Sequence, residues 1–210
     1  MKKILSFALA VMMLCLCFTS CGEKTIEAEP FNAVVSVDTT GHTLHHIEIV
    51  IKDYGTVTLA LDETVAPVTV KNFVGLAEKG FFDGLPITRV QRGFVLQGGQ
   101  SQEYTPSIKG EFASNGFENK LSHTKGIISM ARTEDPDSAS SQFFIMLADN
   151  TGLDGDYAAF GWVTSGMNII DAINEDITSD DYDTSNIQLY RMCFLKPESM
   201  LTIKTIRVID

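Results

Sequence analysis

Large aliphatic residues recur at every second position in two neighbouring stretches of the chain. Residues 47–51 have the sequence IEIVI, and residues 57–61 have the sequence VTLAL. A period of two residues is that of a β-strand with one buried face. The intervening residues 53–55, Asp-Tyr-Gly, have the composition of a turn. The pattern therefore predicts an antiparallel hairpin.

The periodicity changes to that of a helix after residue 65. Apolar residues from Ala66 to Ala77 follow one another at intervals of four, three, one and three residues, which places them on one face of an α-helix. Pro67 is tolerated in the first turn of such a helix, and Gly80 is a typical residue at its end. We therefore expect a helix that covers the core.

Short apolar runs and glycine-rich turns alternate from residue 82 to residue 163. This density of short strands favours a closed antiparallel barrel. A second helix is predicted to begin at Met167 and to reach about Ile173, and a last strand is predicted over residues 201–209. The expected fold class is therefore mainly β.

The first 20 residues have the composition of a secretory signal. Lys2 and Lys3 precede an apolar run that extends from residue 4 to residue 18. This run has about 15 residues, whereas a helix that crosses a membrane needs about 20. We expect the segment to be removed, so it is excluded from the fold.

The end of the apolar run indicates how the mature chain begins. Residues 18–21, Phe-Thr-Ser-Cys, resemble a bacterial lipobox. They predict that Cys21 is lipidated, becomes the new N-terminus and anchors the exported chain to a bacterial membrane; an ordinary cleaved signal with a free Cys21 is the alternative. The predicted organisation is a lipoprotein signal peptide over residues 1–20, a polar tether over residues 21–40 and one folded domain over residues 41–210.

Cysteines that could form a disulfide or bind a metal are few in the mature chain. Of four cysteines, Cys15 and Cys17 leave with the signal and Cys21 carries the lipid, so Cys193 remains alone. The acidic stretch 174–186 lacks the glycine and the terminal glutamate of a calcium-binding loop. We expect no disulfide, no metal and no cofactor.

The mature chain is strongly acidic. The whole sequence has a net charge of −11, and removal of Lys2 and Lys3 gives 14 − 27 = −13. Such a charge repels nucleic acid and anionic lipid head groups. We therefore expect no nucleic-acid partner, and we expect any membrane contact to come through the lipid.

Two stretches carry the candidate chemistry. Residues 82–99, FDGLPITRVQRGFVLQGG, place Arg89 between two turn-forming segments, and residues 126–146 have the sequence GIISMARTEDPDSASSQFFIM. An arginine beside one short apolar run indicates no more than an exposed cation on a strand. Together and in this order, the two stretches resemble the cyclophilin family of peptidyl-prolyl isomerases.

The resemblance covers residues 44–209. It implies a closed eight-stranded antiparallel barrel that is capped by two α-helices, with a groove on its outer surface for an X-Pro segment. The matching blocks are VAPVTVKNFVGLAEKGFFDG at 65–84, GFVLQGG at 93–99, SMA at 129–131, SQFFI at 141–145, LDG at 153–155 and FG at 160–161.

The resemblance also implies roles for single residues. Arg89 corresponds to the catalytic arginine, and Gln97 to a polar group that orients it. The residues implied in substrate binding are Phe94, Val95, Phe144 and Leu153 in a hydrophobic proline pocket, Gln142 as a second polar group, Ala131, Arg132 and Thr133 at the groove edge for residues before the proline, and Tyr157 after the LDG block.

Several positions depart from the family pattern. Ile87-Thr88 stands where many members of the family have Phe-His, and Val95 stands where many have Met. Gly152 stands where many have Trp, and Tyr157 stands where many have His. The missing indole removes a hydrogen-bond donor and part of the groove wall, which weighs against tight binding of cyclosporin.

The implied reaction is rotation about X-Pro bonds, and we expect it to assist the folding of exported proteins. No bond is made or broken, so the reaction needs no nucleophile or metal, and a permanently charged arginine suits it. The expected partners are Pro-containing segments of exported or unfolded proteins, and the chain is expected to be a monomer. The alternative is a catalytically weak module that binds such segments, and a solute-binding lipoprotein does not fit the barrel motifs.

Overall fold

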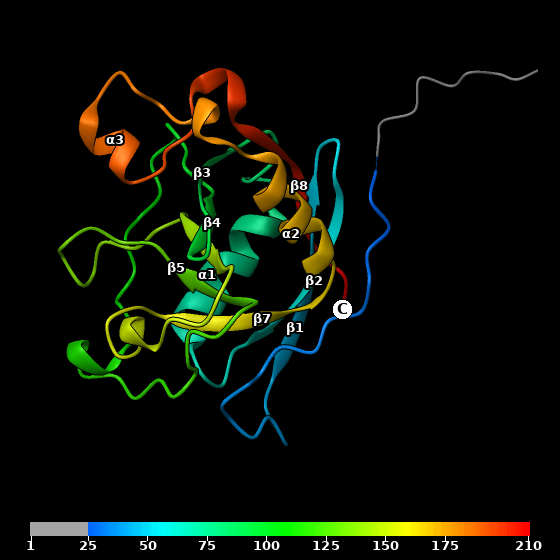
Figure 1. Cartoon of the computed structure of the whole chain (residues 1–210). Helices are drawn as coiled ribbons and strands as arrows, with labels where there is room; N and C mark the ends of the chain where they lie inside the picture. Colours follow the sequence, from blue (N-terminus) through cyan, green and yellow to red (C-terminus); the bar gives the residue numbers. More distant parts are fainter. Residues whose placement is uncertain (1–24) are drawn as a thin grey trace, which may run out of the picture.

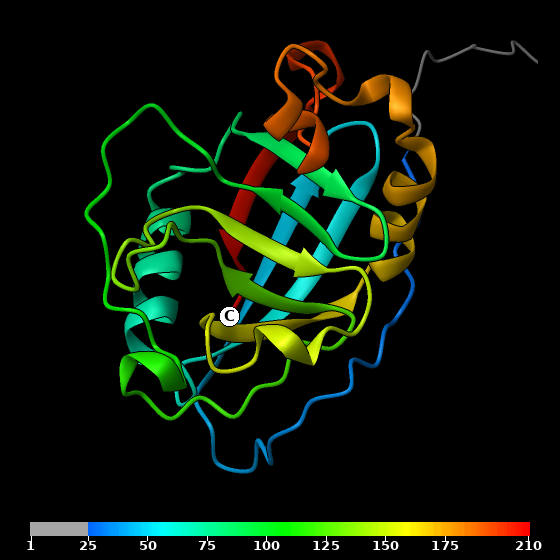
Figure 2. The same cartoon turned by 60° about the vertical axis from the view of Figure 1, so that its left-hand side comes forward.

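The computed structural model describes residues 25–210 and shows eight strands closed into one barrel (Figures 1 and 2). Neighbouring strands all pair antiparallel, in the closed order β1-β2-β7-β5-β6-β4-β3-β8. The predicted fold class, a mainly β eight-stranded antiparallel barrel, is confirmed. The strands are β1 (Leu44–Ile51), β2 (Gly55–Asp62), β3 (Pro86–Gln91), β4 (Val95–Gly98), β5 (Ile127–Met130), β6 (Phe143–Met146), β7 (Ala159–Ser165) and β8 (Leu201–Val208).

Two α-helices lie at opposite ends of the barrel, as Figure 2 shows. They are α1 (Pro67–Glu78) and α2 (Met167–Asp176), close to the predicted positions. A third, shorter helix, α3 (Ile187–Arg191), was not predicted. None of the helices within residues 25–210 has the length and apolar character needed to cross a bilayer.

The N-terminus of α1 is bound by a carboxylate from a distant loop. Glu111 is 1% exposed and accepts hydrogen bonds from the amides of Val68, at 2.9 Å, and Thr69, at 2.8 Å. These amides have no partner within the helix, and a negative charge is favourable at this end of a helix. The contact fastens the long loop between β4 and β5 to α1.

The interior of the barrel is packed with aromatic rings. Phe73 of α1 lies with its ring centroid 4.8 Å from that of Phe82, 5.4 Å from that of Phe143 and 5.2 Å from that of Phe160. All four side chains are at most 1% exposed. Close aromatic packing of this kind adds to the stabilisation that burial gives.

Strand β6 is buried on both of its faces. Phe143 and Ile145 point into the barrel and join the main core, whereas Phe144 and Met146 point outward and join a second, smaller apolar cluster. This division follows the two-residue period of a strand. The second cluster covers the outer face of β4, β5 and β6, and the predicted site lies on it.

Residues 25–40 differ from the tether predicted over residues 21–40, because they are fastened to the barrel wall (Figure 1). The amide of Ile26 donates to the carbonyl of Tyr54 at 2.6 Å, and that of Phe31 donates to the carbonyl of Thr164 at 2.8 Å. Both side chains pack against the main core, so burial of scattered apolar residues outweighs the polar composition of the segment. Residues 1–24, with the predicted signal peptide and Cys21, lie outside the described range.

Candidate active site

The residues predicted to carry the chemistry lie on one lateral row across neighbouring strands. Arg89 of β3 is directly opposite Gln97 of β4, Gln97 is opposite Phe144 of β6, and Phe144 is opposite Ser129 of β5. Residues that are directly opposite one another point to the same face of a sheet. The barrel thus gathers Arg89, Gln97 and Phe144 on one outer surface.

A β-bulge in β3 directs Arg89 to this surface. Ile87 pairs with Gly98, whereas Arg89 pairs with the very next residue of β4, so Thr88 is the extra residue. Ile87 and Val90 both reach the barrel core as a result, and Arg89 points outward between them. Bulges commonly redirect a side chain in this way.

The guanidinium of Arg89 is held by three acceptors. Its Nε donates to the carbonyl of Met192 at 2.6 Å, its Nη1 donates to Oε1 of Gln97 at 3.3 Å, and its Nη2 donates to Oε1 of Gln91. A guanidinium has five N–H donors, so two remain for a ligand. Burial lowers the pKa of Arg89, but an arginine side chain in a protein remains protonated.

Gln142 fixes the orientation of Gln97. The Nε2 group of Gln97 donates to Oε1 of Gln142 at 3.2 Å. The amide nitrogen of Gln97 therefore faces Gln142, and its oxygen faces Arg89. This relay keeps an acceptor next to the guanidinium, as the resemblance implies for the two glutamines.

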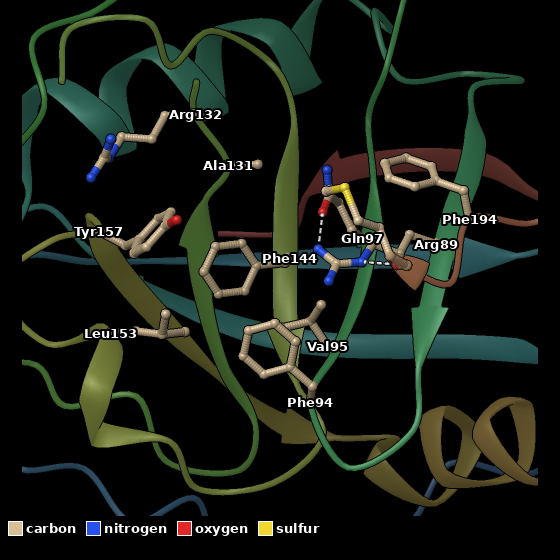
Figure 3. A pocket seen from close by; sticks show the side chains of 11 residues that line it. Arg89, Phe94, Val95, Gln97, Ala131, Arg132, Phe144, Leu153, Tyr157 and Phe194 are labelled. Atoms are coloured by element: carbon tan, nitrogen blue, oxygen red, sulfur yellow. Dashed lines mark hydrogen bonds between the residues drawn. The ribbon is translucent and has the colours of Figure 1, made fainter. Parts of the chain in front are cut away.

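A cavity of about 180 Å³ opens beside Arg89 (Figure 3). Apolar side chains from the start of β4, from β6 and from the 3₁₀ turn at Thr151–Leu153 form much of its lining. Nine of the eleven residues that the resemblance predicts for the site line this cavity. The lining residues are Arg89, Phe94, Val95, Gln97, Ala131, Arg132, Phe144, Leu153, Tyr157, Met192 and Phe194.

The two remaining predicted residues lie in an adjoining depression. Thr133 and Gln142 line a hollow of about 110 Å³, which shares Gln97, Ala131 and Arg132 with the larger cavity. The two hollows therefore adjoin one another, and together they form the candidate groove. All the residues predicted for the active site are therefore brought together.

Arg132 and Tyr157 form the wall of the groove that lies farthest from Arg89 in Figure 3. The guanidinium carbon of Arg132 lies 4.8 Å from the ring centroid of Tyr157 and 5.0 Å from that of Phe112. Tyr157 meets Phe144 edge to face at 5.8 Å. These cation–π and aromatic contacts stiffen the wall. Gly152, which precedes the cavity-lining Leu153, contributes no side chain.

His123 supports the floor of the cavity from behind and was not predicted. Its ring stacks on Phe144 at 6.0 Å, its Nδ1 lies 2.8 Å from Oδ1 of Asp154, and its Nε2 lies 3.0 Å from Oγ of Ser129. Burial lowers the pKa of His123 and outweighs the opposing effect of Asp154. The available signal was Asp154 of the LDG block, a carboxylate that can accept hydrogen bonds from a histidine.

The chain segment 186–195, which contains α3, forms the side of the cavity next to Arg89 and was also missed. Phe194 forms an isolated bridge with Arg89, and its ring centroid lies 6.0 Å from the guanidinium carbon. Met192 lines the cavity as well. The sequence signal was the apolar run around residues 192–195 at the end of an otherwise acidic stretch.

Comparison with known proteins finds cyclophilin-type peptidyl-prolyl isomerases both among family models and among single relatives. The family model "Cyclophilin type peptidyl-prolyl cis-trans isomerase/CLD" matches residues 46–193. "Peptidyl-prolyl cis-trans isomerase A" of Dickeya dadantii (strain 3937) is 40% identical over 164 residues, which cover 73% of this chain and 80% of that protein. "Peptidyl-prolyl cis-trans isomerase B" of Escherichia coli (strain K12) is 37% identical over 146 residues, which cover 64% and 82%.

Solved structures share the fold. The crystal structure of a cyclophilin-type peptidyl-prolyl cis-trans isomerase from Cryptosporidium parvum has a TM-score of 0.65 at 23% identity, and the match covers 80% of this chain and 99% of that chain. A second crystal structure of that isomerase, obtained in the presence of the dipeptide Ala-Pro, has a TM-score of 0.64 at 23% identity and covers 79% and 99%. At this identity the likeness concerns the fold alone.

Proposed function

This chain belongs to the family of cyclophilin-type peptidyl-prolyl cis-trans isomerases, and we propose that it assists the folding of exported proteins at a bacterial membrane. Its reaction is rotation about the peptide bond that precedes a proline. Its substrates are Pro-containing segments of chains that have not yet folded.

The reaction is slow without a catalyst because amide resonance must be lost, at a barrier of about 18–20 kcal/mol. In the twisted transition state the proline nitrogen becomes pyramidal and gains a lone pair. An enzyme accelerates the rotation when it binds this state more tightly than either planar form. A lowering of the barrier by about 7 kcal/mol gives roughly a hundred-thousandfold acceleration.

The observation that carries the catalytic proposal is the position of Arg89. Its guanidinium lies at the edge of an apolar cavity, is fixed by three acceptors and keeps two N–H groups free. The cavity holds the proline ring against Phe94, Phe144 and Leu153. A free N–H of Arg89 then donates to the proline nitrogen while the preceding carbonyl swings, and stabilisation of this kind is large in a water-poor site.

A direct test of the catalytic proposal is exchange spectroscopy by NMR on a short Ala-Pro peptide with residues 25–210. We expect cis–trans exchange to become faster in proportion to the enzyme concentration. Exchange that stays at the uncatalysed rate in the presence of folded protein would overturn the proposal.

The export part of the proposal rests on the sequence of residues 1–21. The first described backbone contact of the barrel wall is at Ile26, five residues after Cys21. Five residues span at most about 18 Å. A lipid on Cys21 therefore holds the barrel close to the membrane rather than at the end of a long tether.

Lipidation is tested by metabolic labelling with a fatty-acid analogue in a bacterial host, followed by membrane fractionation. We expect labelled chain in the membrane fraction and expect Cys21→Ser to abolish the label. Cys15→Ser is the matched control, because it removes a cysteine from the same leader and should leave the label in place. Labelling that survives Cys21→Ser would contradict the proposed anchor.

A further inference from the structure

The segment 186–195 is a wall that the chain builds next to its catalytic arginine. Its Met192 carbonyl accepts from Nε of Arg89 at 2.6 Å, and its Phe194 lies beside the guanidinium in Figure 3. The groove edge at residues 131–133 lies across the cavity from this wall. The two sides of the groove therefore differ in chemistry, with a polar edge on one side and an apolar wall on the other.

The wall is fixed to the barrel. The amide of Leu195, whose side chain is 1% exposed, donates to the carbonyl of Thr88 at 2.8 Å, and the amide of Asp183 donates to the carbonyl of Phe194 at 2.8 Å. The hydroxyl of Tyr182 donates to the carbonyl of Val90 at 3.1 Å. Because the wall is hydrogen-bonded both to β3 and to the chain around Asp183, it presents a fixed surface to the groove.

The backbone of the wall is strained where it meets the cavity. Cys193, which lies between the two cavity-lining residues Met192 and Phe194, has a φ of +57°. This left-handed conformation is uncommon for a residue other than glycine. Strain of this kind persists where the surrounding structure enforces it, and it is frequent at functional sites.

Apolar side chains remain exposed on this wall although the surrounding stretch is acidic. Met192 is 45% exposed and lines the cavity, and Tyr190 and Ile187 of the adjoining helix are 42% and 60% exposed. A group of large apolar residues that borders a binding groove is typical of a contact surface. Met192 belongs both to the cavity lining and to this exposed group, so the surface borders the groove.

We propose that Met192 and Phe194 form a subsite for an apolar side chain that follows the proline of the substrate. The inference rests on the proposed isomerase function and deepens it. The groove edge at residues 131–133 takes the residues before the proline, so the chain after the proline leaves on the opposite side, past Arg89. There it meets Met192 and Phe194. Substrates with a large apolar residue after the proline are the ones that this surface recognises.

The experiment compares two peptides, Ala-Ala-Pro-Phe-Ala and Ala-Ala-Pro-Ser-Ala, with the full-length chain in mild detergent and its Met192→Ser variant. Exchange spectroscopy gives kcat/KM without a coupled protease. We expect wild type to favour the Phe peptide by about tenfold, the size of effect that one apolar contact gives in a pocket. We expect Met192→Ser to reduce that preference to about twofold, because it removes the side chain but keeps the carbonyl that binds Arg89.

The matched control is Ile209→Ser. Ile209 is 44% exposed, like Met192, but it does not line the cavity, so both peptides should keep their wild-type kcat/KM. Circular dichroism verifies that each variant is folded. Equal turnover of the two peptides by wild type, or a full preference retained by Met192→Ser, would overturn the subsite.

A failure of the proposed function has a different signature, namely that wild type turns over neither peptide. The subsite is then decided by titration of the same two peptides followed by NMR. If wild type binds the Phe peptide more tightly than the Ser peptide and Met192→Ser loses this difference, the subsite is supported without catalysis. If wild type binds the two peptides with equal dissociation constants, or if Met192→Ser keeps the full difference, the subsite is overturned.

Discussion

Replacement of His123 by glutamine should change both the stability of the barrel and the dependence of that stability on pH. His123 is fully buried behind Phe144. Asp154 only accepts hydrogen bonds, so Nδ1 of the neutral ring carries the proton and Nε2 accepts from the hydroxyl of Ser129. Glutamine keeps polar atoms at the site but cannot span both partners with a rigid ring.

The magnitude follows from the two hydrogen bonds. A bond to a charged group contributes about 1.5–3 kcal/mol and a neutral one about 1 kcal/mol, and the Asp154 bond lies at the lower end because the Asp154 side chain is 35% exposed. Glutamine retains one of the two bonds and leaves the other partner unsatisfied, which costs about 1–3 kcal/mol for a buried group. We therefore expect His123→Gln to lower the free energy of unfolding by about 2 kcal/mol at pH 7.5.

The pH dependence has a definite sign. Burial lowers the pKa of His123 in the folded state, whereas the unfolded chain takes up the proton near pH 6.5. Below that pH the unfolded state binds more protons, so wild type loses stability as the pH falls and His123→Gln lacks this loss. The difference between the two proteins should shrink by up to about 1.4 kcal/mol between pH 7.5 and pH 5.5.

Urea unfolding at pH 7.5, 6.5 and 5.5, followed by the fluorescence of the single tryptophan, Trp162, measures this difference. All other ionisable groups are the same in the two proteins, so the comparison isolates the contribution of residue 123. A difference that grows as the pH falls would mean that His123 is charged in the folded state. It would refute the argument that burial outweighs the attraction of Asp154.

Three further substitutions test other contacts of the site and the fold. Glu111→Ala leaves two amides of α1 without an acceptor and should lower the free energy of unfolding by about 2–4 kcal/mol in urea titrations. A change below about 0.5 kcal/mol would mean that the carboxylate of Glu111 does not stabilise the start of α1. Gln97→Leu removes one acceptor of Arg89 and should reduce kcat by about tenfold in exchange spectroscopy, and an unchanged kcat would mean that the guanidinium needs no such support. Gly152→Trp supplies the indole that the family pattern has at this position and should tighten cyclosporin binding by about tenfold or more in calorimetry. The Cβ of the new residue would lie 3.1 Å from Oδ1 of Asn150, which must shift slightly. Equal affinities of the two proteins would contradict the expectation that the missing indole weakens cyclosporin binding.

The elements with a clear period could be predicted from the sequence. The alternation at residues 47–51 and 57–61 corresponds to β1 and β2, and the helical spacing after Ala66 corresponds to α1. Each of these patterns arises because one face of the element meets the core, and it can be read from consecutive residues alone. The number of strands and the position of the groove came from the resemblance, since period alone does not determine which strands pair.

Two parts of the site depend on contacts between distant segments and were missed for that reason. His123 has a role only because β5, β6 and the loop at Asp154 meet behind Phe144. The wall at residues 186–195 lies beside Arg89 because the bulge at Thr88 and the bridge to Phe194 place it there. Neither relation leaves a periodic signal in the sequence.

Arg89 is proposed to catalyse the rotation rather than only to bind the substrate. The most direct test measures both kcat/KM and the dissociation constant of a Pro peptide for Arg89→Ala, with Arg92→Ala as the control. Arg92 lies three residues further along, binds the carbonyls of Glu175 and Ile177, and does not line the cavity.

For Arg89→Ala we predict a loss of kcat/KM of at least about a hundredfold, the effect of removing one donor that acts in the transition state. Peptide binding should weaken by less than about fivefold, because the apolar cavity remains, and Arg92→Ala should behave like wild type. Equal losses of turnover and binding, or turnover that survives without Arg89, would contradict the account and favour a module that binds proline segments without isomerising them.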